Sequence, residues 1–156
     1  ELAPTFTCLA LAGKVGSNIA AEIGGMRQKE QIDALQVMGV DTTAFLVLPK
    51  IVSAVIVIPM MVVISAFLGK AGTFGNLVSE AEFMQGLRAF FEPYNIWMME
   101  IKAFVFAFLL TSISCYQGFF VTGGSIELGR ASTNAVVISN VLILLADYLI
   151  AILLTV

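Results

Sequence analysis

The run from Ile51 to Leu68 contains no charged residue, and it is the feature that most narrows what this chain can fold into. An apolar run of about 18 residues or more is typical of a helix that crosses a lipid bilayer. The whole sequence follows the same trend, with 59% hydrophobic and only 12% charged residues, against roughly 25% charged in a soluble domain. The composition therefore predicts an all-α integral membrane protein.

Four segments are long and apolar enough to be predicted as membrane helices within a single domain, 1–156: they are 2–25, 42–68, 96–121 and 132–156. A shorter amphipathic helix is predicted over 79–91, where Ser79 and Glu82 fit a capping box, and it is expected to lie on the membrane surface. The distribution of Lys and Arg places the segment after the first span and the last loop in the cytoplasm, and the middle loop outside.

A short charged helix is predicted between the first two spans, within residues 27–39. Gly39 is expected to end it in the left-handed conformation, and Asp41 is expected to cap the helix that follows. An apolar face on such a charged element needs cover from a partner surface or from the lipid headgroups. We interpret this helix as a cytoplasmic coupling element; a solvated loop is the alternative. Its apolar face comprises Ile32, Leu35 and Met38.

Two ribbons of small residues run along the predicted helix 2–25. Small residues at a spacing of four let a neighbouring helix approach closely in lipid, where van der Waals packing replaces the hydrophobic driving force. Both ribbons are therefore predicted to pack against other helices. One ribbon comprises Ala12, Gly16, Ala20 and Gly24, and the other comprises Gly13, Ser17, Ala21 and Gly25.

Four charged residues fall within or just inside the predicted spans, namely Lys14, Glu22, Lys102 and Asp147. Each costs roughly 2.5–3.5 kcal/mol near the bilayer centre. Antiparallel helices would bring Lys102 and Asp147 within ~7 Å in depth, which predicts an ion pair facing the bundle interior. In the alternative, Lys102 extends to the outer surface and Asp147 faces a water-filled cavity. The role of Lys14 is left open.

Several classes of site find no support in the sequence. The chain has no histidine, which removes the commonest general base and metal ligand, and no nucleotide-binding GxxxxGK[ST] loop occurs. Cys8 and Cys115 are expected to be buried small hydrophobes. No catalytic residue, metal site or cofactor is predicted, and the net charge of −3 indicates no nucleic-acid partner.

Sequence motifs along most of the chain give a resemblance to a known family. They are Ala21-Glu22-Ile23-Gly24, Met26-Arg27, Glu30 to Leu35, Met38 to Asp41, Leu48-Pro49, Cys115 to Gly118, Gly123-Gly124, Gly129 to Thr133 and Ala135 to Val137. On these residues the chain resembles the MlaE/YrbE-type permeases, the membrane subunits of ABC transporters that move lipids with MCE proteins. The likeness is weakest between Gly69 and Pro93.

The resemblance implies more than the residue patterns do. Members of this family have additional N-terminal helices, so the chain is expected to be a fragment. The family implies a homodimer in the bacterial inner membrane, an ABC ATPase subunit that hydrolyses ATP, an MCE-domain protein outside, and a phospholipid or related lipid as cargo. The chain itself is then a transporter permease and no enzyme.

The resemblance also implies roles for individual residues. The helix within 27–39 becomes the coupling helix for the ATPase, ending at Gly39, with Leu35 and Met38 as anchors. Its rim contacts would be Glu30, Gln31 and Asp33. Glu22 is either an interfacial carboxylate held by Arg27 or water, or a polar group at the floor of a lipid cavity. The expected substrate-binding residues are Glu22, Ile23, Lys102 and Asp147.

Other functions remain as alternatives. An ion-coupled secondary transporter or channel could use the intramembrane charges Lys102, Asp147 and Glu22 as a relay. An intramembrane enzyme would need a nucleophile with a base or a metal cluster, and the scattered carboxylates assemble neither. A structural membrane anchor is the least informative possibility, and the density of family motifs disfavours it.

Overall fold

The structure, a computed structural model, describes residues 2–71 and 93–155. Its regular elements in this part are all helical, and no strand occurs in either range. The predicted all-α class is confirmed, whereas the surface helix predicted over 79–91 lies outside the described residues. The elements are α1 (Leu2–Leu11), η1 (Ala12–Gly16), α2 (Ser17–Gln28), α3 (Gln31–Val37), η2 (Thr43–Val47), α4 (Leu48–Ala71), α6 (Pro93–Phe119) and α7 (Ser125–Thr155), where η marks a π-helical turn.

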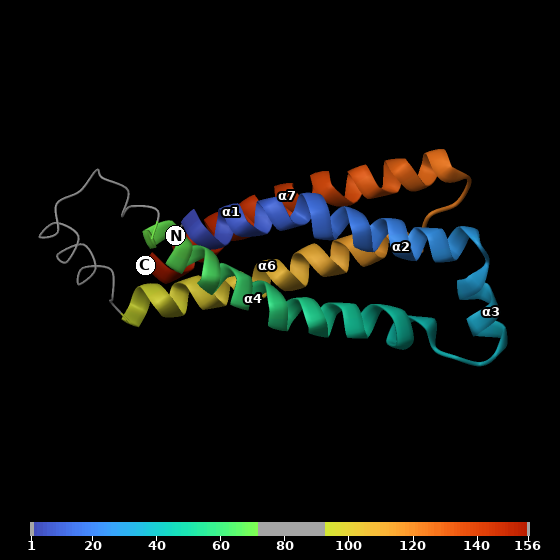
Figure 1. Cartoon of the computed structure of the whole chain (residues 1–156), viewed down its shortest axis with the longest axis horizontal. Helices are drawn as coiled ribbons and strands as arrows, with labels where there is room; N and C mark the ends of the chain where they lie inside the picture. Colours follow the sequence, from blue (N-terminus) through green and yellow to red (C-terminus); the bar gives the residue numbers. More distant parts are fainter. Residues whose placement is uncertain (1, 72–92, 156) are drawn as a thin grey trace, which may run out of the picture.

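The long helices form one elongated bundle, and α3 lies across one end of it (Figure 1). The segments α1, η1 and α2 continue one another as a single rod. α6 packs against α1, α2, α4 and α7, so it is the central helix of the bundle. The connection between α6 and α7 lies at the α3 end, while the start of α1 and the end of α7 lie at the opposite end (Figure 1).

Three helices are long and apolar enough to cross a membrane: Thr43–Leu68, Ile96–Phe119 and Ser125–Leu153. They correspond to three of the four predicted spans. The rod from Leu2 to Gln28 lies alongside them but is not among the three, because Lys14, Asn18 and Glu22 make it more polar. A membrane-crossing role for this first segment stays a prediction.

The last helix begins earlier than the sequence indicated. We expected a loop between the spans 96–121 and 132–156, but α7 already starts at Ser125. Gly123 makes the turn with a positive φ of 127°. Glu127 then stands in the first helical turn, where a carboxylate interacts favourably with the helix dipole, and it pairs with Arg130 at 3.0 Å. These local interactions support helix where the glycines suggested loop.

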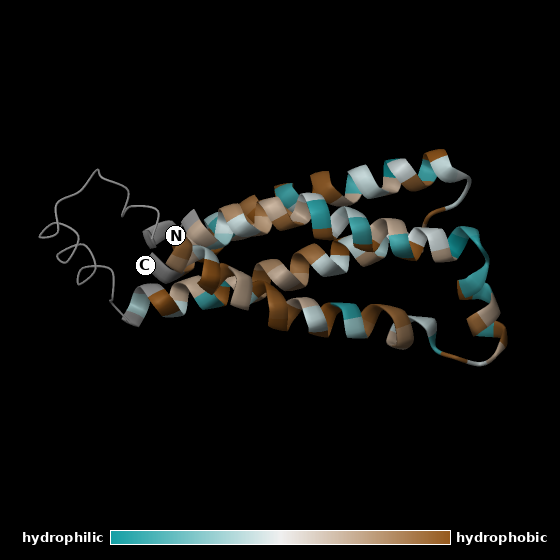
Figure 2. Cartoon of the chain, in the orientation of Figure 1, coloured by the Kyte–Doolittle hydropathy of each residue, from teal (hydrophilic) through white to brown (hydrophobic). Residues whose placement is uncertain are grey.

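The apolar side chains divide between a core and an outer surface. Many large apolar side chains on the outside are exposed, including Ile56 on α4, Phe108 on α6 and Leu145 on α7. Such a surface suits a lipid environment, and apolar residues dominate the long helices in Figure 2. The core between α1, α4, α6 and α7 is built from Cys8, Ala54, Val62, Phe106, Leu110 and Ile143.

Among the described residues, only one of the two small-residue ribbons packs closely against another helix. A Cβ added to Gly118 of α6 would lie 2.7 Å from the carbonyl oxygen of Ala20, and one added to Gly16 would lie 3.0 Å from Ser114 Oγ. Gly24 faces Leu128 and Val121. In the second ribbon, Cβ atoms built on Gly13 and Gly25 would meet nothing within 4 Å among the described residues. The predicted packing of this second ribbon is therefore absent from the described part of the chain.

Candidate functional site

The short helix α3 is set off from its neighbours by two left-handed residues. Glu30 has a φ of 57° and separates α2 from α3, so the helix is shorter than the predicted range 27–39. Arg27 belongs to α2 instead. At the other end, Gly39 has a φ of 78°, as expected. The N–H of Val40 donates to the carbonyl of Leu35, and the N–H of Gly39 donates to that of Gln36, which is the Schellman arrangement.

Asp41 caps the next helical segment, as predicted. Its Oδ1 accepts hydrogen bonds from the Thr43 hydroxyl at 2.6 Å, from the Thr43 N–H at 3.1 Å and from the Ala44 N–H at 3.4 Å. The bond from the Thr43 side chain, followed by the one from the Ala44 backbone, lowers the pKa of Asp41 below its ordinary value. The carboxylate is therefore charged at neutral pH, and the cap fixes where η2 begins.

α3 presents two apolar faces, and the predicted face of Ile32, Leu35 and Met38 is divided between them. Ile32 is fully buried against Ile23, Leu46 and Cys115, and Leu35 is partly buried against the same cluster. Leu35 thus packs against the bundle's own core, and its expected role as an anchor for a partner stays a prediction. The exposed apolar side chains are Val37 and Met38, at 89% and 68% exposure.

Val37 was not predicted from the sequence, although a signal for it was present. Ala34, Val37 and Met38 follow the spacing i, i+3, i+4, which marks one side of a helix, just as Ile32 and Leu35 mark the other. Because α3 has only 7 residues, its two sides both satisfy the helical spacing. The spacing alone therefore does not show which side is buried. The expected rim residues Glu30, Gln31 and Asp33 are all exposed.

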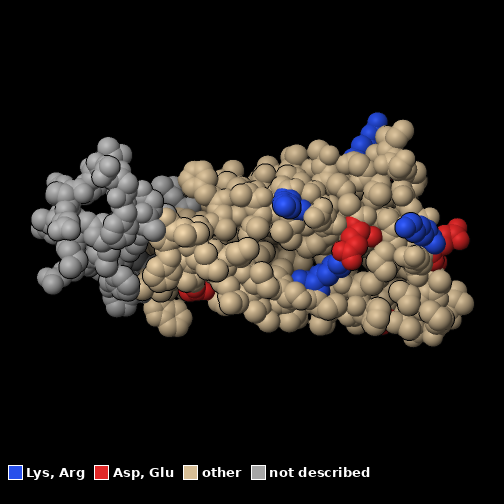
Figure 3. Space-filling view, viewed as in Figure 1, with Lys and Arg blue, Asp and Glu red and all other residues tan. Residues whose placement is uncertain are grey.

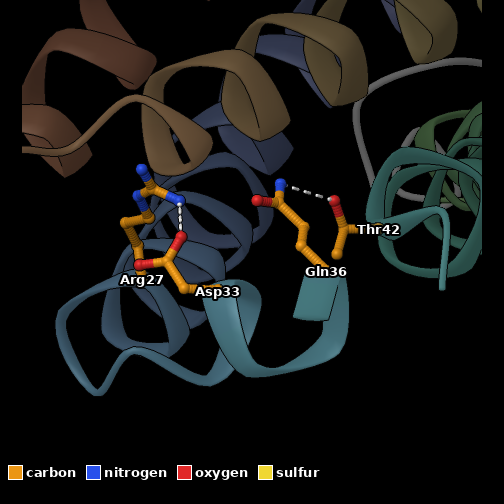
Figure 4. A network of polar contacts seen from close by, with 4 residues as sticks. All are labelled: Arg27, Asp33, Gln36 and Thr42. Carbon is orange, nitrogen blue, oxygen red and sulfur yellow. Dashed lines mark hydrogen bonds and ion pairs between the residues drawn. The ribbon is translucent and has the colours of Figure 1, made fainter. Parts of the chain in front are cut away.

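Polar contacts tie α3 to the elements around it (Figure 4). Arg27 Nη1 lies 2.7 Å from Asp33 Oδ1, linking α2 to α3. Gln36 Nε2 lies 3.4 Å from Thr42 Oγ1, linking α3 to the start of the next span. Gln28 donates to the carbonyl of Gly123 at 3.1 Å, which connects this region to the α6–α7 turn. Movement of α3 would therefore be felt by α2 and by the segment leading into α4.

Glu22 has a partner that the sequence did not indicate. We expected Arg27 or water, but Glu22 Oε2 lies 2.7 Å from Lys50 Nζ of α4. Arg27 lies beyond Glu22 towards the end of α2 and pairs with Asp33 instead. The Glu22 side chain is 61% exposed. Ile23, also expected to face a substrate, is fully buried in the cluster around Ile32, so its side chain is not accessible.

The predicted ion pair between α6 and α7 is present. Lys102 Nζ lies 2.8 Å from Asp147 Oδ1, and Lys102 is only 1% exposed. The alternative in which Lys102 extends to the outer surface is therefore wrong. Both groups lie inside candidate spans, where an ion pair offsets part of the cost of placing charges in lipid.

Further polar groups lie inside the bundle that the sequence analysis did not single out. The buried hydroxyls of Thr111 and Ser114 donate to the carbonyls of Ala107 and Leu110, one turn earlier in α6. Ser139 is also fully buried, and its hydroxyl has no hydrogen-bond partner within residues 2–71 and 93–155. Single serines in an apolar helix carry little sequence signal, because a serine can bond to its own helix.

Comparison with known proteins agrees with this architecture. The family "Permease MlaE" matches residues 1–153. Relatives include a probable ABC transporter permease of Rickettsia bellii, which is 40% identical over 96% of this chain and 60% of the relative. One from Synechocystis is 34% identical, over 95% of this chain and 58% of the relative.

A chloroplast relative extends the comparison to plants. It is the protein trigalactosyldiacylglycerol 1 of Arabidopsis thaliana, 33% identical over 97% of this chain and 45% of its own length. The chain thus spans about 60% of the length of the Rickettsia relatives that it matches, and less of the plant protein. Because the match covers residues 1–153, the chain belongs to the MlaE permease family.

Proposed function

We propose that this chain is part of the membrane permease of an ABC transporter that moves phospholipids or related lipids between the inner membrane and an MCE-domain protein. The family and the names of the bacterial relatives support a permease. The name of the plant relative includes a glycerolipid, which supports a lipid cargo. A separate ABC ATPase subunit would supply the energy, and a second permease copy would complete the membrane unit.

We assign the α3 end of the bundle to the cytoplasm. Arg27, Lys29, Lys50 and Arg130 all belong to segments at this end, and cytoplasmic segments are enriched in Lys and Arg. Charged side chains also gather towards this end on the face shown in Figure 3. In this orientation α3 projects towards the side where a nucleotide-binding subunit would sit, and the MCE-domain protein would lie at the opposite end.

The two-sided character of α3 is the observation that carries this proposal. Val37 and Met38 are exposed and suit an apolar groove on the ATPase. Ile32 on the other side is buried among Ile23 of α2, Leu46 of η2 and Cys115 of α6. A push on α3 would therefore reach three elements through close packing, and packed elements shift as nearly rigid bodies.

Capture of the ATPase subunit by the full-length permease tests this assignment. We expect Val37→Asp with Met38→Asp to reduce capture at least tenfold, because two carboxylates would have to be buried in an apolar groove. Val37→Ala with Met38→Ala keeps the surface apolar and is expected to lower capture much less. Both positions are exposed, so the thermal stability of the permease should not change in either variant. Equal capture by the Asp and Ala variants would remove α3 as the docking element.

The intramembrane charges leave an ion-coupled secondary transporter or channel as a second candidate. The buried Lys102–Asp147 pair favours it, because such pairs occur in ion and proton pathways. This candidate does not need α3 to bind an ATPase. Lipid or ion transport by the permease alone, without nucleotide, would support it, whereas strict dependence on ATP and the ATPase subunit would exclude it.

Fewer residues are proposed to contact the substrate than the sequence indicated. Ile23 is fully buried, and Lys102 is buried against Asp147. Glu22 alone of the four combines a charge with an exposed side chain at the α3 end. We therefore retain Glu22 as the residue proposed to meet the lipid, and we assign Lys102 and Asp147 to holding α6 and α7 together.

A further inference from the structure

The Glu22–Lys50 ion pair joins two helices that share α6 as a neighbour. α2 packs mainly against α6 and α7, whereas α4 packs mainly against α6 and α1. The pair therefore links α2 directly to α4 at the α3 end, with Nζ and Oε2 2.7 Å apart. The Lys50 side chain is mostly covered, while the Glu22 carboxylate is open on one side. A second molecule can therefore approach the pair.

If the span begins at Thr43, the pair is expected just below the level of the lipid headgroups. At ~1.5 Å per residue, Lys50 is about 10 Å inside the span that begins at Thr43. Glu22 is at a similar depth, about 9 Å before the end of α2 at Gln28. The headgroup of a lipid that moves slightly inwards can reach charges at this depth. Lys side chains also extend towards the headgroup layer.

An open, mainly apolar groove lies on η2 and the start of α4, the helix that carries Lys50. Val47 belongs to this groove and also packs against the buried cluster around Ile32. The groove is thus formed by one face of the helix that carries Lys50. Its lining is suited to an acyl chain, and it consists of Thr43, Ala44, Val47, Leu48, Ile51 and Val52.

We propose that Glu22 and Lys50 form a headgroup site for a zwitterionic phospholipid with a primary ammonium group. The inference rests on the proposed function, since it takes a phospholipid as the cargo. The lipid phosphate would take the place of Glu22 at Lys50, and the lipid ammonium would take the place of Lys50 at Glu22. Each charge then exchanges one partner for another, so no charge is left unpaired in a region of low dielectric.

Other headgroups fit the pair less well. An anionic lipid would satisfy Lys50 but would place its phosphate beside an unpaired Glu22 carboxylate, and like charges repel. A choline headgroup carries a positive charge but no N–H, so it cannot donate a hydrogen bond to Glu22. The site is therefore expected to bind phosphatidylethanolamine most strongly, phosphatidylcholine less, and phosphatidylglycerol least.

Cys115 offers a reporter for the exchange. Its buried thiol on α6 packs in one cluster with Ile23, which follows Glu22, and with Val47, which lies one helical turn before Lys50. When a lipid separates Glu22 from Lys50, this thiol is expected to become more accessible to N-ethylmaleimide. Cys8, buried in the separate core between α1 and α4, serves as an internal reference that should not change.

Competition among lipids with identical acyl chains tests the site in the purified full-length permease, by native mass spectrometry. We expect the wild type to retain phosphatidylethanolamine at least fivefold over phosphatidylglycerol. Glu22→Gln leaves Lys50 without its carboxylate and should reverse this preference. Lys50→Met leaves Glu22 to repel phosphate and should lower retention of all three lipids at least fivefold. Glu127→Gln with Arg130→Gln, which removes another exposed ion pair at this end, should leave retention unchanged.

The outcomes separate this site from the proposed function. A wild type without headgroup preference, or Glu22 and Lys50 variants that match the Glu127/Arg130 control, would overturn the site even if ATP-driven lipid transport is intact. Selective binding in a permease that transports no lipid with its ATPase would instead overturn the proposed function. Labelling of Cys115 should rise with phosphatidylethanolamine in the wild type, and an unchanged rate would contradict the exchange.

Discussion

Lys102 is the residue whose environment is most unlike that of its type. Lysines are almost never fully buried unless they are paired, and Lys102 is 1% exposed with Asp147 at 2.8 Å. The pair fixes α6 against α7 at one depth. A buried pair of this kind is weak evidence for added stability, but removing one member leaves a charge behind in the interior.

Exchange of the two charges tests the pair. Asp147→Asn should destabilise the permease by about 3–5 kcal/mol, because it removes the carboxylate from a buried ammonium. Lys102→Asp alone should be at least as harmful. The double variant Lys102→Asp with Asp147→Lys should recover part of this loss, measured as thermal unfolding in detergent. A double variant no more stable than the singles would show that the two charges are not coupled.

At the scale of elements, the contact between α2 and α6 depends on glycine. Gly118 faces the backbone of Ala20 so closely that a Cβ would lie 2.7 Å from its carbonyl oxygen and 3.1 Å from its Cα. Backbone atoms cannot move aside as a flexible side chain can. The two helices approach this closely because small residues occur on both surfaces, which is the main source of helix association in lipid.

Gly118→Ala is therefore expected to force α2 and α6 apart and to destabilise the bundle by about 1–3 kcal/mol. Gly25→Ala on α2 is the matched control, because a Cβ there meets nothing within 4 Å among the described residues. A helical Gly→Ala change without a clash is expected to be neutral or stabilising by up to ~1 kcal/mol. Thermal unfolding of both variants measures the difference. Similar effects of the two changes would contradict close packing at Gly118.

At the scale of the whole molecule, the hydrogen bonds and ion pairs around α3 lie together at one end of the bundle. The polar, hydrogen-bonded network sits at the α3 end, where α2, α3, η2 and the α6–α7 turn meet. Along the remaining length of the helices, many large apolar side chains are exposed, together with polar residues such as Lys14 and Asn18. Because α6 contacts every other long helix, a displacement that begins at α3 reaches the rest of the bundle through it.

This arrangement makes a prediction about membrane orientation. Single cysteines at Gln36 and Ser125, both exposed at the α3 end, should react with a membrane-impermeant maleimide only after cells are permeabilised. A cysteine at Tyr94, exposed at the start of α6, should react in intact cells. Cys8→Ala with Cys115→Ala provides the background. Labelling of position 36 from outside intact cells would invert the orientation and remove the proposed contact with an ATPase.

The features that were predicted correctly from the sequence depend on neighbouring residues or on depth along a helix. The left-handed Gly39 and the Asp41 cap follow from backbone preferences within a few residues. The Lys102–Asp147 pair follows from the fixed rise per residue, which places both charges at one level. The apolar runs, likewise, predict spans without reference to any contact, and three described helices are long and apolar enough for this.

Only the tertiary structure decided which side of each helix faces which neighbour. It turned Leu35 inwards and left Val37 and Met38 exposed. It also paired Glu22 with Lys50 rather than with Arg27. The ribbon that contains Gly16 and Gly24 packs against neighbouring helices, whereas a Cβ on Gly13 would meet nothing within 4 Å among the described residues. The physical reason is that lipid does not discriminate between one apolar face and another, so rotation about a helix axis is set by the packing of the whole bundle.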